Sequence, residues 1–175
     1  MASQKKDLST PSHLIAEKKG IPERFLLKVL IDYPSEQAEL SVLRRHHEGF
    51  RPQNLEDAGI QPVVSAEDLA AMQDEVRRTT VEDKVFNYIY EIVKATRTSN
   101  DILVGASPRA GIALLNCSKA IAALRGRDFV IPDDVKELAL PVLRHRVILR
   151  PEAEVEGLNV DRVLSSVINA QVVPR

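Results

Sequence analysis

The sequence predicts a mainly α-helical protein, in which a helical bundle is preceded by a single β-strand that has no partner strand. Apolar residues recur at helical spacing through most of the 175 residues. Patterns that start helices, such as Ser65 with Asp68 and Ser107 with Pro108, precede several of these apolar stretches. A short apolar run at 25–31 is flanked by prolines, and its length is typical of a buried strand.

The chain divides into three expected parts: a polar flexible arm at 1–20, a part with the strand at 21–64, and a helical part at 65–175. The strand at 25–31 cannot satisfy its own backbone groups, which indicates that its sheet is missing. Ser35 is placed to cap a helix over 35–45. The glycines and prolines after this helix predict a loop that continues to residue 64.

The helical part begins with two capping-box patterns, Ser65 with Asp68 and Thr80 with Asp83, each of which predicts the start of a helix. The next helix, over 109–125, is apolar nearly all round, so we expect it at the centre of the bundle. The remaining predictions are a helix that starts at Pro132, a short extended piece at 147–149 and a last helix capped by Asn159.

Composition and charge exclude several classes of site. Lys and Arg total 24 and Asp and Glu total 25, and the resulting net charge of −1 does not steer a protein to nucleic acid. Aromatic residues make up 4% and Trp is absent, which argues against a base-stacking surface. The single cysteine, Cys117, excludes an internal disulfide and a multi-cysteine metal site. The polar N-terminus and the lack of a long apolar run predict a cytoplasmic protein with no membrane segment.

Four residues with reactive side chains have ordinary structural interpretations. His46 and His47 would point about 100° apart on a helix, a poor arrangement for one shared metal ion, so we expect no metal site. Cys117 lies among apolar neighbours, where an inert thiol is the usual state. His145 lies near the end of a predicted helix, where the helix dipole favours a cation.

Arg109 is the most informative candidate residue. It lies in the first turn of an apolar helix, directly after Ser107 and Pro108, where free N–H groups and the helix dipole attract anions such as phosphate. A structural salt bridge to Asp101 or Asp133 explains the same arginine equally well. The surrounding GASPRAG stretch superficially resembles a phosphate loop, but no lysine follows it and no strand clearly precedes it.

Residues 96–164, together with Ala95, contain four motifs that resemble the C-terminal helical lid of MoxR-family AAA+ ATPases. In order along the chain they are ATR at 95–97, GASPRA at 105–110, GRDFVIPDDV at 126–135 and VLRHRVIL at 142–149. The resemblance extends back through ERFLLKVLIDYPSEQAEL, which is similar to the end of the ATPase core. It covers nearly everything but the first twenty residues.

The resemblance implies roles for individual residues. Arg109 in the SPRA motif matches the sensor-2 arginine, which contacts the γ-phosphate region of ATP, with Ser107 and Pro108 beside it. Arg24 matches the position of the arginine finger, which reaches the ATP of a neighbouring subunit and would act in catalysis. Both roles agree with the chemistry of phosphoryl transfer, in which positioned cations offset developing negative charge.

The resemblance also implies cofactors and partners. The intact family uses ATP and magnesium, works as a ring of AAA+ subunits in chaperone-like remodelling, and often has a von Willebrand A-domain partner. The family's phosphate loop and magnesium-binding strand lie upstream of the matched region. We therefore expect this chain to be a truncated, degenerate or excised C-terminal part that binds no cofactor and hydrolyses no ATP by itself.

Two other functions stay open from the sequence. One is a free-standing helical module that binds a protein partner and carries out no nucleotide chemistry. The other, which the net charge does not favour, is DNA binding through basic side chains. The arginines that would serve it are Arg125, Arg127, Arg144, Arg146 and Arg150.

Overall fold

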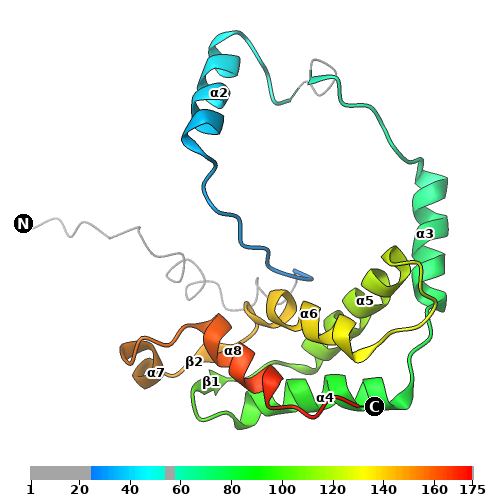
Figure 1. The fold of residues 1–175 in the computed structure, drawn as a ribbon, viewed down its shortest axis with the longest axis vertical. Helices are drawn as coiled ribbons and strands as arrows, with labels where there is room; N and C mark the ends of the chain where they lie inside the picture. The colour runs from blue at the N-terminus through cyan, green and yellow to red at the C-terminus, as the bar shows by residue number, and fades with distance from the viewer. Residues whose placement is uncertain (1–24, 54–57, 175) are drawn as a thin grey trace, which may run out of the picture. The chain divides into compact units, whose positions relative to one another are not determined.

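The computed structural model describes residues 25–53 and 58–174. The predicted flexible arm at 1–20 and the candidate residue Arg24 lie outside the described residues. The described chain is mostly helical, with helices α2 to α8 and one small sheet of strands β1 and β2 (Figure 1). The predicted fold class, a mainly α-helical bundle, is confirmed. Contacts divide the chain into two units, residues 29–75 and residues 76–174 together with 25–28.

Side-chain hydrogen bonds cap the N-terminal ends of helices α2 and α3. Helix α2 spans Glu36–His47, and the Ser35 Oγ accepts a hydrogen bond from the Ala38 N–H at 3.4 Å. Helix α3 spans Ala66–Arg78 and begins with the predicted capping box. There the Ser65 Oγ accepts from the Asp68 N–H at 3.0 Å, and the Asp68 carboxylate accepts from the Ser65 N–H at 2.9 Å. Both predicted helix starts are therefore confirmed.

The strand predicted over 25–31 is not formed. Residues 25 and 26 form a bend and residues 27–31 have no regular structure, and none of them pairs with a strand in the described chain. Most of their side chains are exposed, Phe25 by 62% and Ile31 by 89%. An apolar run forms a strand only where a second strand accepts its backbone hydrogen bonds. Here one backbone group of the segment bonds to helix α6 instead: the Lys28 N–H donates to the Pro141 carbonyl oxygen at 2.8 Å.

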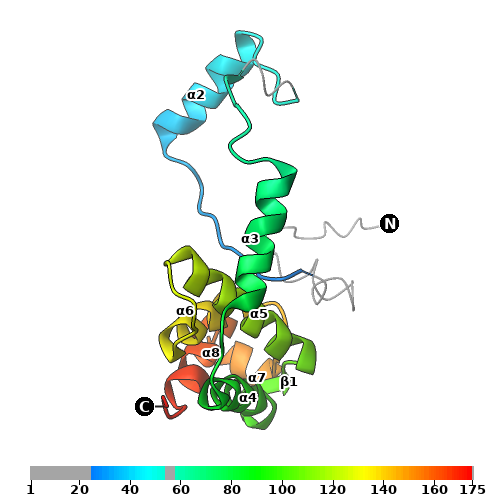
Figure 2. The same ribbon diagram turned by 90° about the vertical axis from the view of Figure 1, so that its right-hand side faces the viewer.

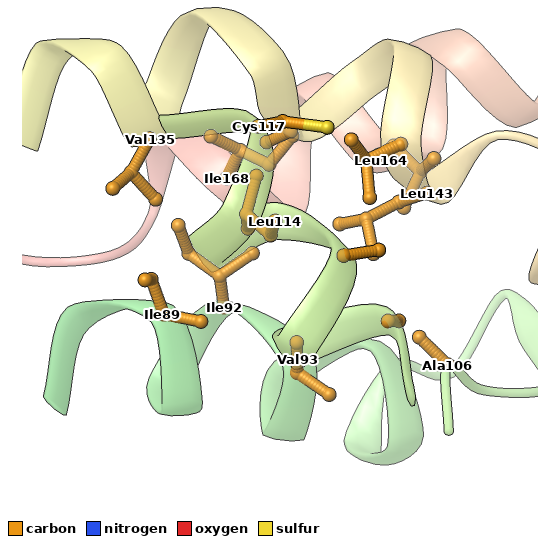
Figure 3. Close-up of a cluster of buried hydrophobic side chains, with 14 of the residues drawn as sticks. Ile89, Ile92, Val93, Ala106, Leu114, Cys117, Val135, Leu143, Leu164 and Ile168 are labelled. Atoms are coloured by element: carbon orange, nitrogen blue, oxygen red, sulfur yellow. The ribbon is translucent and has the colours of Figure 1, made fainter. Parts of the chain in front are cut away.

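Four helices of the second unit form the core. Helix α5 packs on α4 and α6, and α8 packs on α4 and α6 (Figures 1 and 2). Figure 3 shows buried side chains from these helices gathered in one cluster, among them Ile92, Leu114, Leu143 and Leu164. The helices in this unit are α4 (Asp83–Thr98), α5 (Pro108–Leu124), α6 (Pro132–Leu143), α7 (Pro151–Val155) and α8 (Val160–Asn169).

Helix α5 is central, as predicted, but it is not buried all round. Ala110, Leu114 and Cys117 face the core, whereas Leu124 is 83% exposed. A helix covered by neighbours on only part of its circumference leaves apolar residues in contact with solvent. Among the described residues, no helix is both long and apolar enough to cross a membrane.

The small sheet contacts α4 through strand β1. Strand β1 (Ile102–Val104) pairs antiparallel with β2 (Ile148–Leu149), and Ile102 faces Leu149 across the pair. Strand β2 corresponds to the extended piece expected at 147–149. Strand β1 corrects the interpretation that no clear strand precedes Gly105, because three residues are too short for a periodic pattern.

The Thr80–Asp83 capping box is also corrected. Helix α4 begins at Asp83 after Glu82, and no side chain caps its first turn. Thr80 instead joins the segment before α6, since its N–H donates to the Asp128 carbonyl at 2.7 Å and its carbonyl accepts from the Val130 N–H at 3.0 Å. Thr80 therefore forms a long-range backbone pairing and does not cap α4.

Candidate functional site

The candidate site is the N-terminus of α5. Ser107 has the extended backbone of an N-cap residue, and Pro108 occupies the first turn, as the sequence predicts. The Ser107 hydroxyl does not cap the helix, and its Oγ is buried without a hydrogen-bond partner in the described chain. Arg109 follows with an exposed side chain. The first turn therefore carries an exposed guanidinium at a helix N-terminus, where Pro108 has no N–H and the Ala110 N–H donates to the Ser107 carbonyl at 2.9 Å.

The main chain just before α5 is attached to the end of α4. The Ala106 N–H donates to the Thr96 Oγ1 at 2.9 Å, and the Arg97 Nε donates to the Ala106 carbonyl at 2.8 Å. The Thr96 hydroxyl in turn donates to the Val93 carbonyl at 2.6 Å. Because both polar groups of Ala106 are held, the direction in which α5 starts is fixed by the last turn of α4.

Gly105 allows this close attachment. A Cβ atom at this position would lie 2.7 Å from the Cα and 2.8 Å from the backbone nitrogen of Arg97. Backbone atoms cannot move aside as a flexible side chain would, so only glycine fits here. Sequence reasoning missed the roles of Thr96, Arg97 and Gly105, although all three lie in the ATR and GASPRA motifs that carry the family resemblance.

Arg109 makes no hydrogen bond or ion pair within the described residues, and neither Asp101 nor Asp133 forms a salt bridge with it. The first turn of α5 also contains no acidic residue. An arginine at the positive end of the helix dipole is unfavourable unless an anion lies nearby. The sequence left open an anion site and an internal salt bridge. In the described chain, Arg109 has no carboxylate partner for such a salt bridge.

Two arginines surround a buried carboxylate at the start of α6. The Asp134 side chain is fully buried, and it accepts from both the Arg127 guanidinium, at 2.6 and 2.8 Å, and the Arg125 guanidinium, at 3.2 Å. Its Oδ2 also accepts from the Ile131 N–H at 3.0 Å. Burial alone would raise the pKa of Asp134, but these hydrogen bonds outweigh it and the pKa is lowered.

This cluster weakens the case for DNA binding. Arg125 also forms a bidentate pair with Glu137, at 2.8 and 3.0 Å, and Arg144 pairs with Asp161 at 3.1 Å. Arginines whose N–H groups are held by carboxylates have fewer donors left for phosphates. Most of the arginines proposed for DNA are therefore engaged inside the fold.

The remaining chemistry-bearing residues are two neighbouring histidines and one cysteine. No group of three or more metal-ligating side chains occurs among the residues that the structure describes, and His46 and His47 are exposed. Cys117 is buried in the core, and burial raises the pKa of its thiol, although the charge of Arg146 opposes this. A thiol held protonated in this way is a weak nucleophile.

Comparison with known proteins identifies a family domain in this chain. Residues 94–167 match the family model of the AAA lid domain. Protein YeaC of Bacillus subtilis, described as uncharacterized, is 39% identical over 152 residues, which are 87% of this chain and 46% of YeaC. The chaperone MoxR1 of Mycobacterium tuberculosis is 31% identical over 162 residues, which are 87% of this chain and 41% of MoxR1.

A solved structure agrees with these relatives. The crystal structure of a Cytophaga hutchinsonii protein assigned as an ATPase matches with a TM-score of 0.73 and 30% identity, over 99% of this chain and 52% of that chain. The chain belongs to the MoxR family of AAA+ ATPases. This MoxR-family chain spans about half the length of the relatives that it matches.

The lid match of the MoxR-family chain includes the whole of α5, and thus Ser107, Pro108 and Arg109. It also includes the residues that attach α5 to α4, which explains why the motifs around them are recognisable. Arg24, the expected arginine-finger residue, lies outside the described residues. The individual roles of these side chains in ATP chemistry stay predictions.

Proposed function

We propose that this chain supplies the lid of a MoxR-type AAA+ ATPase and that Arg109 contacts the phosphates of ATP. The observation that supports this most directly is the isolation of Arg109. Its exposed guanidinium lies at the positive end of α5 with no carboxylate partner in the described chain. A phosphate oxygen would offset both the side-chain charge and the dipole at that point.

The proposed chemistry is electrostatic. ATP carries its negative charge on the phosphates, and an arginine held in a fixed direction stabilises the extra charge that develops during phosphoryl transfer. The Ala106 N–H donates to Thr96 and its carbonyl accepts from Arg97, and these two bonds would fix the direction of the helix start that carries Arg109. The Ser107 hydroxyl is proposed as one further donor beside Arg109, which requires its buried Oγ to become exposed when ATP binds. Arg24 is proposed to reach a neighbouring subunit's ATP.

The remaining machinery is proposed to lie in other parts of the intact protein. The 175-residue sequence contains no G-x-x-x-x-G-K-[ST] phosphate loop, the motif whose backbone N–H groups hold ATP phosphates and whose hydroxyl binds magnesium. ATP and magnesium are therefore proposed as cofactors of the intact ATPase. Its proposed activity is ATP-driven, chaperone-like remodelling by a ring of subunits with a von Willebrand A-domain partner.

The decisive test changes Arg109 to alanine in two settings. In the 175-residue chain, we expect Arg109→Ala to leave the Tm unchanged or slightly raised, because it removes a cation from the positive end of a helix. At the matching arginine of an intact relative, the same change should lower ATP hydrolysis by about a hundredfold. Arg162→Ala, at an exposed position of α8, is the control in the isolated chain.

Two results would contradict the proposal. A clear loss of stability with unchanged hydrolysis in the intact enzyme would show that Arg109 is structural. Calorimetry of the 175-residue chain, alone and mixed with an intact relative, tests the cofactor proposal separately. Magnesium-dependent ATP turnover by the chain alone, persisting through stringent purification, would overturn the proposal that the phosphate-binding machinery lies elsewhere.

A further inference from the structure

Three consecutive residues after α6, Arg144, His145 and Arg146, contact a segment about 120 residues earlier in the chain. The Arg146 guanidinium donates to the carbonyl oxygens of Phe25, at 2.6 Å, and Leu26, at 2.9 Å. The His145 Nε2 lies 3.0 Å from the same Phe25 oxygen. Because a carbonyl oxygen can only accept, this Nε2 carries the hydrogen and donates it.

Two further bonds extend the contact along the segment. The Arg144 guanidinium lies 3.4 Å from the Lys28 carbonyl oxygen, and it also pairs with Asp161. In the opposite direction, the Lys28 N–H donates to the Pro141 carbonyl at 2.8 Å. The segment is therefore held at residues 25, 26 and 28, from both its carbonyl and its N–H side.

The Arg146 side chain is buried, and the carbonyls of Phe25 and Leu26 supply acceptors for its N–H groups. Arg146 is only 6% exposed, and it donates to the Val142 carbonyl as well. A guanidinium has five N–H donors and no acceptor, so burying it is unfavourable unless nearby oxygens receive those hydrogens. The Val142 carbonyl near the end of α6 and the carbonyls of Phe25 and Leu26 together supply such oxygens.

The hydrogen bonds that hold the segment are made by its backbone. On the segment side, each of the hydrogen bonds described above uses a main-chain atom of residues 25, 26 or 28. The Phe25 and Leu26 side chains are exposed and take no part in these bonds. Recognition of this kind resembles strand addition, in which main-chain hydrogen bonds supply the affinity.

We propose that Arg144, His145 and Arg146 form a receptor for the main chain of residues 25–28 of the same molecule. Through this receptor the lid holds the segment that precedes residues 29–75 in the chain. The inference rests on the proposed function in one respect: in an intact ATPase, the receptor would transmit movement between the lid and the ATPase core. These three residues are positioning residues, because they act through the segment that they hold.

Hydrogen exchange of the Lys28 amide, followed by NMR on the 175-residue chain, tests the receptor without any nucleotide. We expect the amide to be protected in the unmodified chain. Arg146→Ala should speed its exchange about tenfold or more, because charge-assisted hydrogen bonds are lost from the same segment. Arg150→Ala is the matched control, since Arg150 is exposed and close in sequence to the receptor. It should leave the exchange rate unchanged.

A second variant keeps the test valid if the first one does not fold. His145→Ala removes one bond to Phe25 and leaves the buried Arg146 in place, so it should give a smaller increase in Lys28 exchange. Amides of α4 report folding in every variant. Lys28 exchange that stays unchanged in a folded receptor variant, or protection that depends on protein concentration and so comes from a second copy, would overturn the proposal. Either result would leave the ATP proposal untouched.

Discussion

At the scale of single residues, Gly105 is the position where side-chain size matters most for the site. Gly105→Ala would bring a Cβ atom to 2.7 Å from the Arg97 Cα and push the attachment between α4 and α5 apart. We expect it to lower the free energy of unfolding by about 1–3 kcal/mol, the usual effect of forcing extra volume into a packed position. Urea denaturation followed by circular dichroism measures the change.

Gly111→Ala is the matched control for this prediction. Gly111 lies inside α5, where an added Cβ would meet only methyl groups of Ile89 and Val93 at 3.9 Å. Alanine is the better helix former by about 0.5–1 kcal/mol, so this variant should be more stable than the unmodified chain. Equal effects of the two substitutions would show that the close approach at Gly105 does not constrain the fold.

At the scale of elements, the start of α6 depends on Asp134. The folded-state pKa of this carboxyl is lowered, whereas an unfolded Asp titrates near about 3.9. The folded state therefore releases the proton more readily than the unfolded state does. The stability that Asp134 contributes is fully present above about pH 4, and it is lost as the pH falls through the folded-state pKa.

Asp134→Asn tests this network. We expect a loss of about 2–4 kcal/mol at pH 7, because Arg127 loses its charged partner next to a buried site. The variant should also lose less stability than the unmodified chain as the pH falls below about 4. Asp128→Asn, at an exposed position two residues before Val130, is the control. An unchanged acid dependence in Asp134→Asn would contradict the assigned network.

At the scale of the whole molecule, the two units differ in what holds them. Every described residue from 29 to 75 is exposed, whereas the second unit has a continuous apolar core. Helices of 12 and 13 residues, such as α2 and α3, are marginal in water without tertiary packing. Hydrogen exchange measured by mass spectrometry should therefore be fast in α2 and slow in α4 and α5.

Protein concentration provides the control for this prediction. Fast exchange in α2 at every concentration is the expected result for a helix without buried residues. Protection of α2 comparable with that of α4 would show that the first unit is covered by packing, either in the chain or between copies. Peptides covering 36–47 and 83–98 allow the two helices to be compared within one sample.

Local signals predicted much of the secondary structure. The helix starts at Ser35, Ser65, Pro108 and Asn159 follow from residues within one turn of each other, and the structure confirms them. The errors share one cause. The run at 25–31 lacks a partner strand, β1 finds its partner more than forty residues away, and Thr80 pairs with the segment before α6. In each case a distant residue decides the outcome.

By itself, the sequence determined the mainly helical class, the helix starts, the family resemblance and the place of Arg109 in the first turn of α5. Only the tertiary structure decided that Arg109 has no carboxylate partner in the described chain and that Asp134 is buried between two arginines. It also decided that Arg144, His145 and Arg146 bind backbone carbonyls about 120 residues away. The physical reason is range: caps and helical periodicity act within a few residues, whereas burial and ion pairing depend on which distant segments meet.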